Sequence, residues 1–142
     1  MGVTTPRQVP WAELREQAHS AATRAYAPYS HVHVGAAALT ASGNVVVGSN
    51  VENASYGLTL CAECSLVSDL VRGGGGRLVA LSVVAGDGQP LAPCGRCRQM
   101  LFEHAGAQLL IDQGDQGDPL TLGDLLPFAF GPDDLPTRGT RE

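Results

Sequence analysis

Two short cysteine-containing segments combine metal ligands with a carboxylate. They are Cys61-Ala62-Glu63-Cys64 and Pro93-Cys94-Gly95-Arg96-Cys97. Thiolates are preferred ligands of Zn²⁺, and a site with three protein ligands keeps a fourth tetrahedral position for a water that the metal acidifies. Paired CxxC spacing seldom arises by chance, so it favours a metal site over unrelated buried cysteines. We therefore expect these two segments to form a zinc centre.

The fourth cysteine leaves two alternatives open. If Cys61, Cys94 and Cys97 bind the ion, the site is open and catalytic, whereas ligation by Cys64 as well closes it into a structural site. In the catalytic alternative, Glu63 lies two residues after a ligand. There it can take a proton from zinc-bound water and pass it to a substrate nitrogen. In the structural alternative, a zinc module with four cysteine ligands, Glu63 has no catalytic role.

The composition fits a single domain spanning residues 1–142, and it excludes several classes of partner. Hydrophobic residues make up 44% of the chain and charged residues 16%, which supports a packed core. The net charge of −5 disfavours nucleic acid and suits a small neutral ligand. Neither a signal sequence nor a run of about 18 apolar residues is apparent, so we expect no membrane partner and a cytoplasmic location.

The apolar pattern predicts an α/β order of elements, with later strands running parallel and helices covering both faces of the sheet. Helical spacing predicts helices at about 11–26, 60–71 and 93–104. A hairpin is expected at 32–39 and 45–47, with further strands at 78–84 and 109–111. An acidic, glycine-rich loop should follow at 112–118, and a flexible tail at about 137–142.

Each cysteine segment is expected where a loop enters a helix. Free N–H groups and the partial positive charge of a helix N-terminus favour thiolate over thiol. Cys94 and Cys97 are three residues apart on a first turn and face the same side of the helix, while Cys61 approaches from the other helix. The C-x-E pattern followed by P-C-x-x-C is also a variant of the zinc nucleobase deaminase signature.

Over about residues 11–131 the chain resembles the small homotetrameric cytidine deaminases. The resemblance rests on segments 25–30, 34–37, 50–59, 61–63 and 93–99, which occur in family order. It implies a three-layer α/β/α fold with a mixed five-stranded sheet and helices on both faces. It also implies one Zn²⁺ per subunit and a homotetramer with shared active sites.

The same resemblance implies roles for particular residues. Cys61, Cys94 and Cys97 would be the zinc ligands and Glu63 the proton shuttle. Asn50 and Glu52 would hold the ribose hydroxyls. The other substrate-binding residues implied are Val51, Ala62, which offers backbone contact to the base, Val32, Tyr56 at a subunit junction, and Phe130, which reaches a neighbouring subunit's pocket.

Two departures from the family pattern affect the expected site. Cys64 stands where the family commonly has an arginine, and Val32 stands where it commonly has an aromatic residue. Three thiolates over-neutralise Zn²⁺, and the arginine normally offsets this. Our hypothesis is that helix N–H groups, with Arg96 or Arg98, supply the offset, and that Cys64 is a thiol beside the ligand set.

The function that the resemblance implies is hydrolytic deamination of cytidine, and of deoxycytidine, to the uridines and ammonia in pyrimidine salvage. Zinc-activated hydroxide would attack C4 of the base, with Glu63 as proton shuttle. One alternative is a deaminase of a related aminopyrimidine nucleoside such as blasticidin S. The other is the structural zinc module with four cysteine ligands.

Overall fold

A mixed five-stranded sheet forms the centre of the fold, in a computed structural model that describes residues 9–136. The strand order is β2-β1-β3-β4-β5. β1 runs antiparallel to both β2 and β3, β3 pairs with β4 in parallel, and β5 returns antiparallel to β4. The strands are β1 (Val34–Thr40), β2 (Val45–Ser49), β3 (Leu78–Ala85), β4 (Leu110–Ile111) and β5 (Leu120–Thr121). The tail expected at 137–142 lies outside the described residues.

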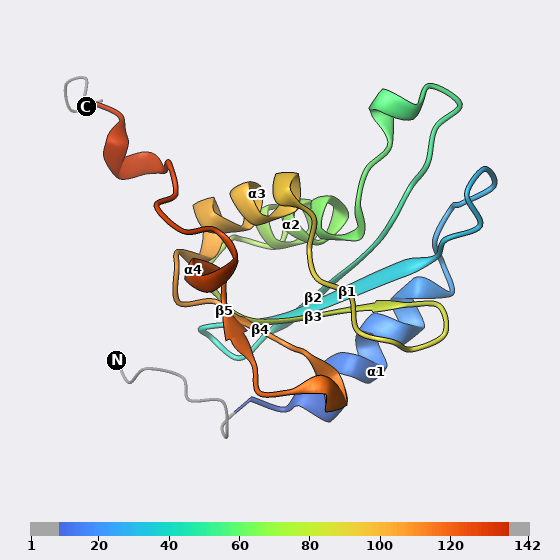
Figure 1. Cartoon of the computed structure of the whole chain (residues 1–142), viewed down its shortest axis with the longest axis horizontal. Coiled ribbons are helices and arrows are strands. Elements are labelled where there is room, and N and C mark those ends of the chain that lie inside the picture. Colours follow the sequence, from blue (N-terminus) through green and yellow to red (C-terminus); the bar gives the residue numbers. More distant parts are fainter. Residues whose placement is uncertain (1–8, 137–142) are drawn as a thin grey trace.

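Helices cover both faces of this sheet, as the resemblance implied (Figure 1). α1 (Trp11–Ala22) packs on one face, and α2 (Ala62–Arg72) and α3 (Gly95–Ala105) pack on the other. The short helix α4 (Leu122–Leu125) follows β5 directly. None of the helices in the described part of the chain has the length and apolarity needed to cross a bilayer.

Two apolar cores follow from the two-residue period of the strands. On β1, Ala36 and Ala38 join the core beneath α2 and α3, while Ala37 between them joins the core beneath α1. On β3, Leu81 and Val83 face the α2–α3 side. The sheet is therefore buried on both faces, as the runs of apolar residues predict.

Two glycines allow helices to approach the sheet closely. A Cβ at Gly35 of β1 would collide with the backbone oxygen of Ala18, so α1 crosses β1 at that point. A Cβ at Gly48 of β2 would collide with the backbone oxygen of Ala62 in the first turn of α2. Because Ala62 lies between Cys61 and Glu63, the contact at Gly48 sets the position of the metal-binding turn.

The first helix ends at Ala22, four residues before the predicted end. The Tyr26 N–H donates to the backbone oxygen of Asn50 at 3.0 Å, and the Glu52 N–H donates to that of Tyr26 at 2.8 Å. This pairing with a distant segment draws the backbone out of the helix. The following loop, which includes Tyr29 and Ser30, is thereby brought against Glu52.

The region expected to be an acidic loop at 112–118 begins with a buried carboxylate. Asp112 is 5% exposed and accepts hydrogen bonds from Arg15 Nε and Nη2 at 2.7 and 2.8 Å. It also accepts from Ser82 Oγ and from the Gly114 N–H. The loop prediction holds at Asp112, which lies in neither a helix nor a strand, but the pattern did not predict the burial of its carboxylate, nor β5 and α4 after the loop.

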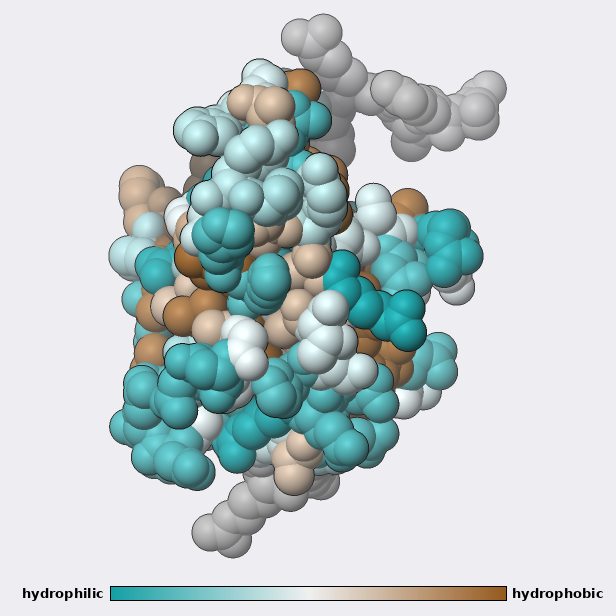
Figure 2. Space-filling model, turned by 90° about the vertical axis from the view of Figure 1, so that its right-hand side faces the viewer, coloured by the Kyte–Doolittle hydropathy of each residue, from teal (hydrophilic) through white to brown (hydrophobic). Residues whose placement is uncertain are grey.

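Two segments project from the body of the fold (Figure 1). The first, residues 51–60, is closed at its base by a pair of backbone hydrogen bonds between Val51 and Leu60. The second is the described C-terminal part, residues 126–136. The face that carries the 51–60 segment shows apolar side chains distributed among polar ones (Figure 2).

Candidate metal centre and active site

The N-termini of α2 and α3 present the three predicted zinc ligands. Cys61 and Cys94 are the N-cap residues of the two helices, each with extended backbone angles, and Cys97 lies in the first turn of α3. Both helices pack on the same face of the sheet, which brings residues 33 positions apart in sequence into contact. The predicted placement of both cysteine segments at helix starts is confirmed.

The geometry of the three sulfurs fits a zinc ion. All three Sγ atoms lie within 4.8 Å of one another, and those of Cys61 and Cys94 are 3.8 Å apart. Zn–S bonds of about 2.3 Å in a tetrahedral array place sulfurs about 3.8 Å apart, so little movement is needed to bind the ion. Among the described residues this is the one cluster of potential ligands, and it does not include Cys64.

The local environment shifts the pKa values of the three thiols in different directions. Burial raises the pKa of Cys61 and of Cys97, whereas a hydrogen bond from the Cys97 backbone N–H lowers the pKa of Cys94. A thiol must lose its proton to become a ligand, so zinc binding here displaces protons from buried sulfur.

Glu63 lies beside the cluster on the first turn of α2. It is 4% exposed, and its Oε2 accepts a hydrogen bond from Cys97 Sγ at 3.5 Å. Burial raises the pKa of this carboxyl. A buried carboxyl whose charged form is destabilised, next to a three-thiol cluster, has the properties of a group that holds and returns a proton.

A cavity of about 380 Å³ opens over this site. Cys61, Ala62, Glu63 and Cys94 contribute to its wall, whereas Cys97 is fully buried. The remaining lining residues are Ser30, Val32, Val34, Asn50, Glu52, Thr59, Leu60, Val83, Leu91 and Ala92. The three-thiol cluster and its neighbouring carboxyl therefore meet a hollow large enough for a small organic molecule.

Comparison with known proteins agrees with the zinc centre indicated by the geometry of the site. Residues 11–111 match the family described as "Cytidine and deoxycytidylate deaminase zinc-binding region". The chain is 61% identical over 128 residues to a cytidine deaminase of Mycobacterium tuberculosis, covering 90% of this chain and 95% of that protein. This chain belongs to the cytidine deaminase family. Membership makes it a zinc-dependent hydrolase, and Cys61, Cys94 and Cys97 fit one Zn²⁺ per chain.

Solved structures of cytidine deaminases share the whole fold. A crystal structure from Mycobacterium tuberculosis superposes with a TM-score of 0.83 at 60% identity, covering 87% of this chain and 98% of that one. A second, from Burkholderia pseudomallei, gives 0.77 at 43% identity, covering 86% of this chain and all of that one. These likenesses span the sheet and the helices that carry the cysteines.

The cytidine deaminase resemblance predicted two sugar-binding residues, and both line the cavity. Asn50 is almost buried, and its amide holds the backbone on either side of His33: Oδ1 accepts from the Val34 N–H and Nδ2 donates to the Val32 oxygen, both at 2.8 Å. One amide hydrogen and one lone pair remain for a ligand. Asn50 therefore also fixes the position of Val32 at the cavity wall.

Glu52 is held by the loop after α1. Its Oε1 accepts from the backbone N–H groups of Tyr29 and Ser30 at 3.0 and 3.1 Å. Hydrogen bonds from the Ser30 side chain and from these N–H groups lower the pKa of Glu52. The carboxylate is thus oriented and ionised, and Oε2, which accepts from neither N–H group, keeps a lone pair for a ligand.

Three other predicted substrate-binding residues do not line the cavity of their own chain. Val51 is exposed at the base of the projecting segment. Tyr56 is 75% exposed near the tip of that segment, where its ring packs edge-on against Tyr29 with centroids 6.0 Å apart. Phe130 is 60% exposed, and its backbone oxygen accepts from Gln99 Nε2. A second copy of the chain would have to bring Tyr56 or Phe130 to a cavity.

Sequence reasoning missed several cavity residues. Leu91 and Ala92 line the wall because the Leu91 N–H pairs with the oxygen of Val83 and extends the edge of the sheet. The sequence offered one signal of their role, which is their position directly before Pro93 and the second cysteine segment. Ser30 also lines the cavity, and its place in the segment 25–30 marked it without showing its role.

The two arginines expected to offset the thiolate charge have different partners. Arg98 donates to the backbone oxygens of Pro93 and Leu125 at 2.8 and 2.9 Å, so it braces α3 against α4. Arg96 donates from Nη2 to Cys64 Sγ at 3.2 Å.

Proposed function

We propose that this chain catalyses hydrolytic deamination of cytidine, and of deoxycytidine, to uridine and deoxyuridine with release of ammonia. The observation that carries the proposal is the buried Glu63 carboxyl beside a three-thiol cluster at the wall of a cavity. Replacing an amino group on an aromatic ring by hydroxyl needs an acidified water and a group that moves protons. Both requirements are met within the first turns of α2 and α3.

Zinc supplies Lewis acidity to a water in its fourth position. Glu63 would act in two directions: it takes a proton from the attacking water and donates it to N3 of the base, and it later takes the proton of the new C4 hydroxyl and passes it to the departing amine. Burial raises the pKa of Glu63, which favours the proton-carrying form of its carboxyl, and this supports the role. Its near-complete burial keeps bulk water from that carboxyl.

Substrate orientation follows from the groups at the far wall of the cavity. Glu52 Oε2 and the free positions of the Asn50 amide accept from and donate to sugar hydroxyls. A carboxylate in the wall opposes a negatively charged ligand, which favours a neutral nucleoside over its phosphate. Contact through the 3′-hydroxyl allows both ribose and deoxyribose, and Ala62 offers backbone contact to the base.

The working assembly in this proposal is a homotetramer with shared active sites, in which Phe130 and Tyr56 complete a neighbour's cavity. Their exposure supports this, because apolar rings in water favour burial at an interface. We place the enzyme in the cytoplasm, in pyrimidine salvage, with small-molecule nucleosides as its partners and neither nucleic acid nor membrane.

The decisive experiment is an ultraviolet assay of cytidine and deoxycytidine conversion with the purified protein and with Glu63→Gln. The variant should bind zinc stoichiometrically and lose at least about 100-fold in kcat, because the amide cannot carry the proton. Glu103→Gln on the exposed face of α3 is the matched control and should keep full activity.

Three outcomes would contradict the proposal. They are an active Glu63→Gln variant, full activity after removal of zinc by a chelator, and turnover of blasticidin S without turnover of cytidine. The last would assign the site to a related aminopyrimidine nucleoside.

A further inference from the structure

The charge of the metal centre depends on the residues beside its three thiol ligands. Three thiolates around a dication leave a net negative charge, which lowers the Lewis acidity on which the proposed function depends. The position after Glu63, where the family commonly has an arginine, is here Cys64. The positive charge is therefore absent from α2 at this position.

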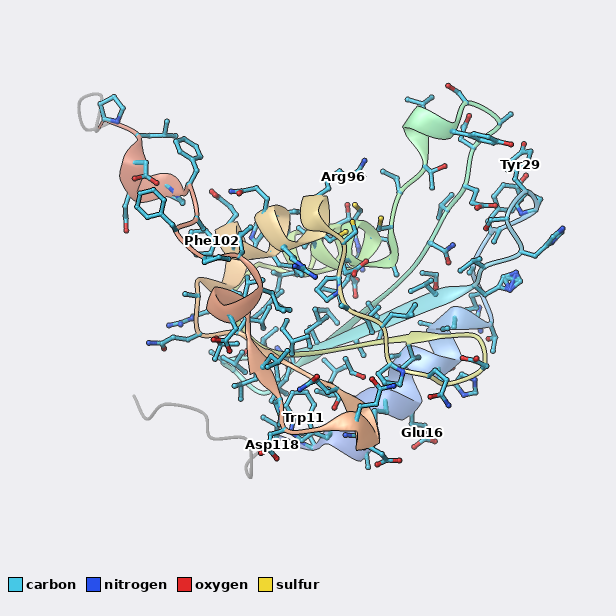
Figure 3. All side chains as sticks on the ribbon, viewed as in Figure 1. Trp11, Glu16, Tyr29, Arg96, Phe102 and Asp118 are labelled. Carbon is cyan, nitrogen blue, oxygen red and sulfur yellow. The ribbon has the colours of Figure 1, made fainter. Side chains whose placement is uncertain are left out.

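A positively charged residue of α3, Arg96, contacts Cys64 from the neighbouring helix. It lies between Cys94 and Cys97 in sequence, at the start of α3 (Figure 3). Its Nη2 donates across to Cys64 Sγ on α2 at 3.2 Å. Cys61 and Cys97 are close enough to interact electrostatically with it. A small sulfur acceptor on α2 thus holds a cation that comes from the opposite helix.

We propose that Arg96 supplies the positive charge that offsets the thiolates, with Cys64 as the acceptor that fixes its guanidinium. In the family pattern the arginine lies on α2, at the position of Cys64. In this chain the arginine, Arg96, lies on α3. Arg96 is a positioning residue: it touches neither substrate nor ion, and it acts through the sulfurs.

Two other arginine side chains of the ligand-bearing helices have partners other than the cysteines. Arg98 donates to the oxygens of Pro93 and Leu125 and braces the backbone. Arg72 pairs with Asp69 at 2.9 Å in the last turn of α2, at the opposite end of the helix from Cys61. The distance from the sulfurs makes Arg72 a suitable control for loss of one positive charge.

The primary test uses the cobalt-substituted protein, whose thiolate-to-cobalt charge-transfer band reports electron density on sulfur without any turnover. Arg96→Ala should move this band to lower energy, because thiolates without a neighbouring cation are better electron donors. Arg96→Lys retains the charge and should keep the band close to its position in the unmodified protein. Arg72→Ala should leave the band where it is in the unmodified protein.

The sharpest variant transposes the charge. Cys64→Arg combined with Arg96→Ala returns the cation to α2 and should bring the band back toward its original position. In the zinc enzyme, Arg96→Ala should lower kcat about tenfold with little change in KM, because neighbours of metal ligands alter reactivity rather than substrate contacts. The transposed variant should recover most of this loss.

The results separate this inference from the proposed function, on which it rests. An unmoved cobalt band in Arg96→Ala, or a shift that neither lysine nor the transposed arginine reverses, overturns the role of Arg96 even if cytidine is turned over. If the unmodified protein fails to deaminate any pyrimidine nucleoside, the proposed function fails, and the cobalt band still reports whether Arg96 acts on the sulfurs.

Discussion

Glu52 illustrates how one residue is prepared for binding before any ligand arrives. One carboxylate oxygen is taken by two backbone N–H groups of the loop after α1, so the side chain is oriented by the main chain. The second oxygen is left to accept a hydrogen bond. Because the anionic form is favoured, the acceptor carries full charge at neutral pH. Hydrogen bonds to charged acceptors are about twice as strong as neutral ones.

This arrangement predicts a specific effect of Glu52→Gln. The KM for cytidine should rise at least about tenfold, because a charged acceptor is replaced by a neutral one. For 2′,3′-dideoxycytidine, which lacks the 2′- and 3′-hydroxyls, the variant and the unmodified enzyme should have similar KM values. Steady-state kinetics with both substrates checks this, and an equal KM increase for the two would show that Glu52 does not contact the 2′- or 3′-hydroxyl.

At the scale of elements, buried polar contacts fix the helices on the sheet. Arg15 of α1 reaches Asp112 at the end of β4, and Ser82 of β3 donates to the same carboxylate. Burial raises the pKa of Asp112, but hydrogen bonds from Arg15, Gly114 and Ser82 outweigh it, and the net pKa is lowered. This carboxylate therefore ties one helix to two strands.

Asp112→Asn should lower the free energy of unfolding by about 2 kcal/mol at pH 7, since it removes the charged acceptor and leaves Arg15 partly buried without its partner. A carboxyl with a depressed pKa contributes stability above its unfolded pKa and loses it as pH falls through the folded value. The difference between the two proteins should therefore be constant near neutrality and shrink in acid.

Urea unfolding at a series of pH values measures this difference. Asp115→Asn, an exposed neighbour in the same loop, is the control and should change stability little. A stability difference that grows in acid would contradict the assignment of Asp112 as a stabilising anion.

A second element-scale contact places the metal-binding turn. The Ser65 hydroxyl accepts from the Ser49 N–H at 2.8 Å and donates to the Ser49 oxygen at 3.0 Å, which ties α2 to β2. Gly48 lies directly beneath the same turn, where no side chain fits. The position of the zinc ligand Cys61 thus depends on a glycine in the preceding strand.

Gly48→Ala should therefore displace the start of α2 and affect both stability and metal binding. We expect a loss of at least about 2 kcal/mol in unfolding free energy, because the added Cβ meets backbone atoms. Zinc affinity, measured by competition with a chromogenic chelator, should fall as well. Gly57→Ala is the control, since a Cβ there meets nothing within 4 Å. Unchanged zinc affinity in a destabilised Gly48→Ala would show that α2 adjusts independently of Cys61.

Local patterns were sufficient to predict the main helices, the longer strands and the metal ligands. The periodicity within 60–71 and the spacing of Cys94 and Cys97 are properties of short segments, so they are visible in sequence. The early end of α1, the strand β5 and the burial of Asp112 depend on partners up to about 100 residues away. The Arg96–Cys64 contact is of the same kind: the sequence suggested two arginines, and only the packing of α3 on α2 distinguishes them.

At the scale of the whole molecule, the two projecting segments carry apolar rings into solvent. Phe128 is fully exposed and Phe130 and Tyr56 are largely so, although other aromatic residues such as Trp11 and Phe102 are partly buried. The cost of exposing these rings supports the proposal that copies of the chain cover one another's cavities.

Shared sites predict recovery of activity when two inactive variants are mixed. In the proposed homotetramer, Glu63→Gln lacks the proton carrier and Phe130→Ala lacks the ring offered to the neighbour, so each variant alone should be nearly inactive. Co-expression in equal amounts should restore about a quarter of the original sites, those that take each intact residue from a different subunit. The control is the doubly substituted chain co-expressed with Glu63→Gln, which should stay inactive. An absence of recovery in the mixed sample would show that each site is complete within one chain.

The unequal exposure of the three sulfurs also bears on how the enzyme acquires and loses its ion. Cys97 is fully buried in the first turn of α3, whereas Cys94 is exposed and lines the cavity. An incoming thiol or chelator can attack from that side and take over one bond before the others break. The ion would then be transferred between a carrier and the enzyme by stepwise ligand substitution. A nucleoside bound in the cavity would obstruct this substitution.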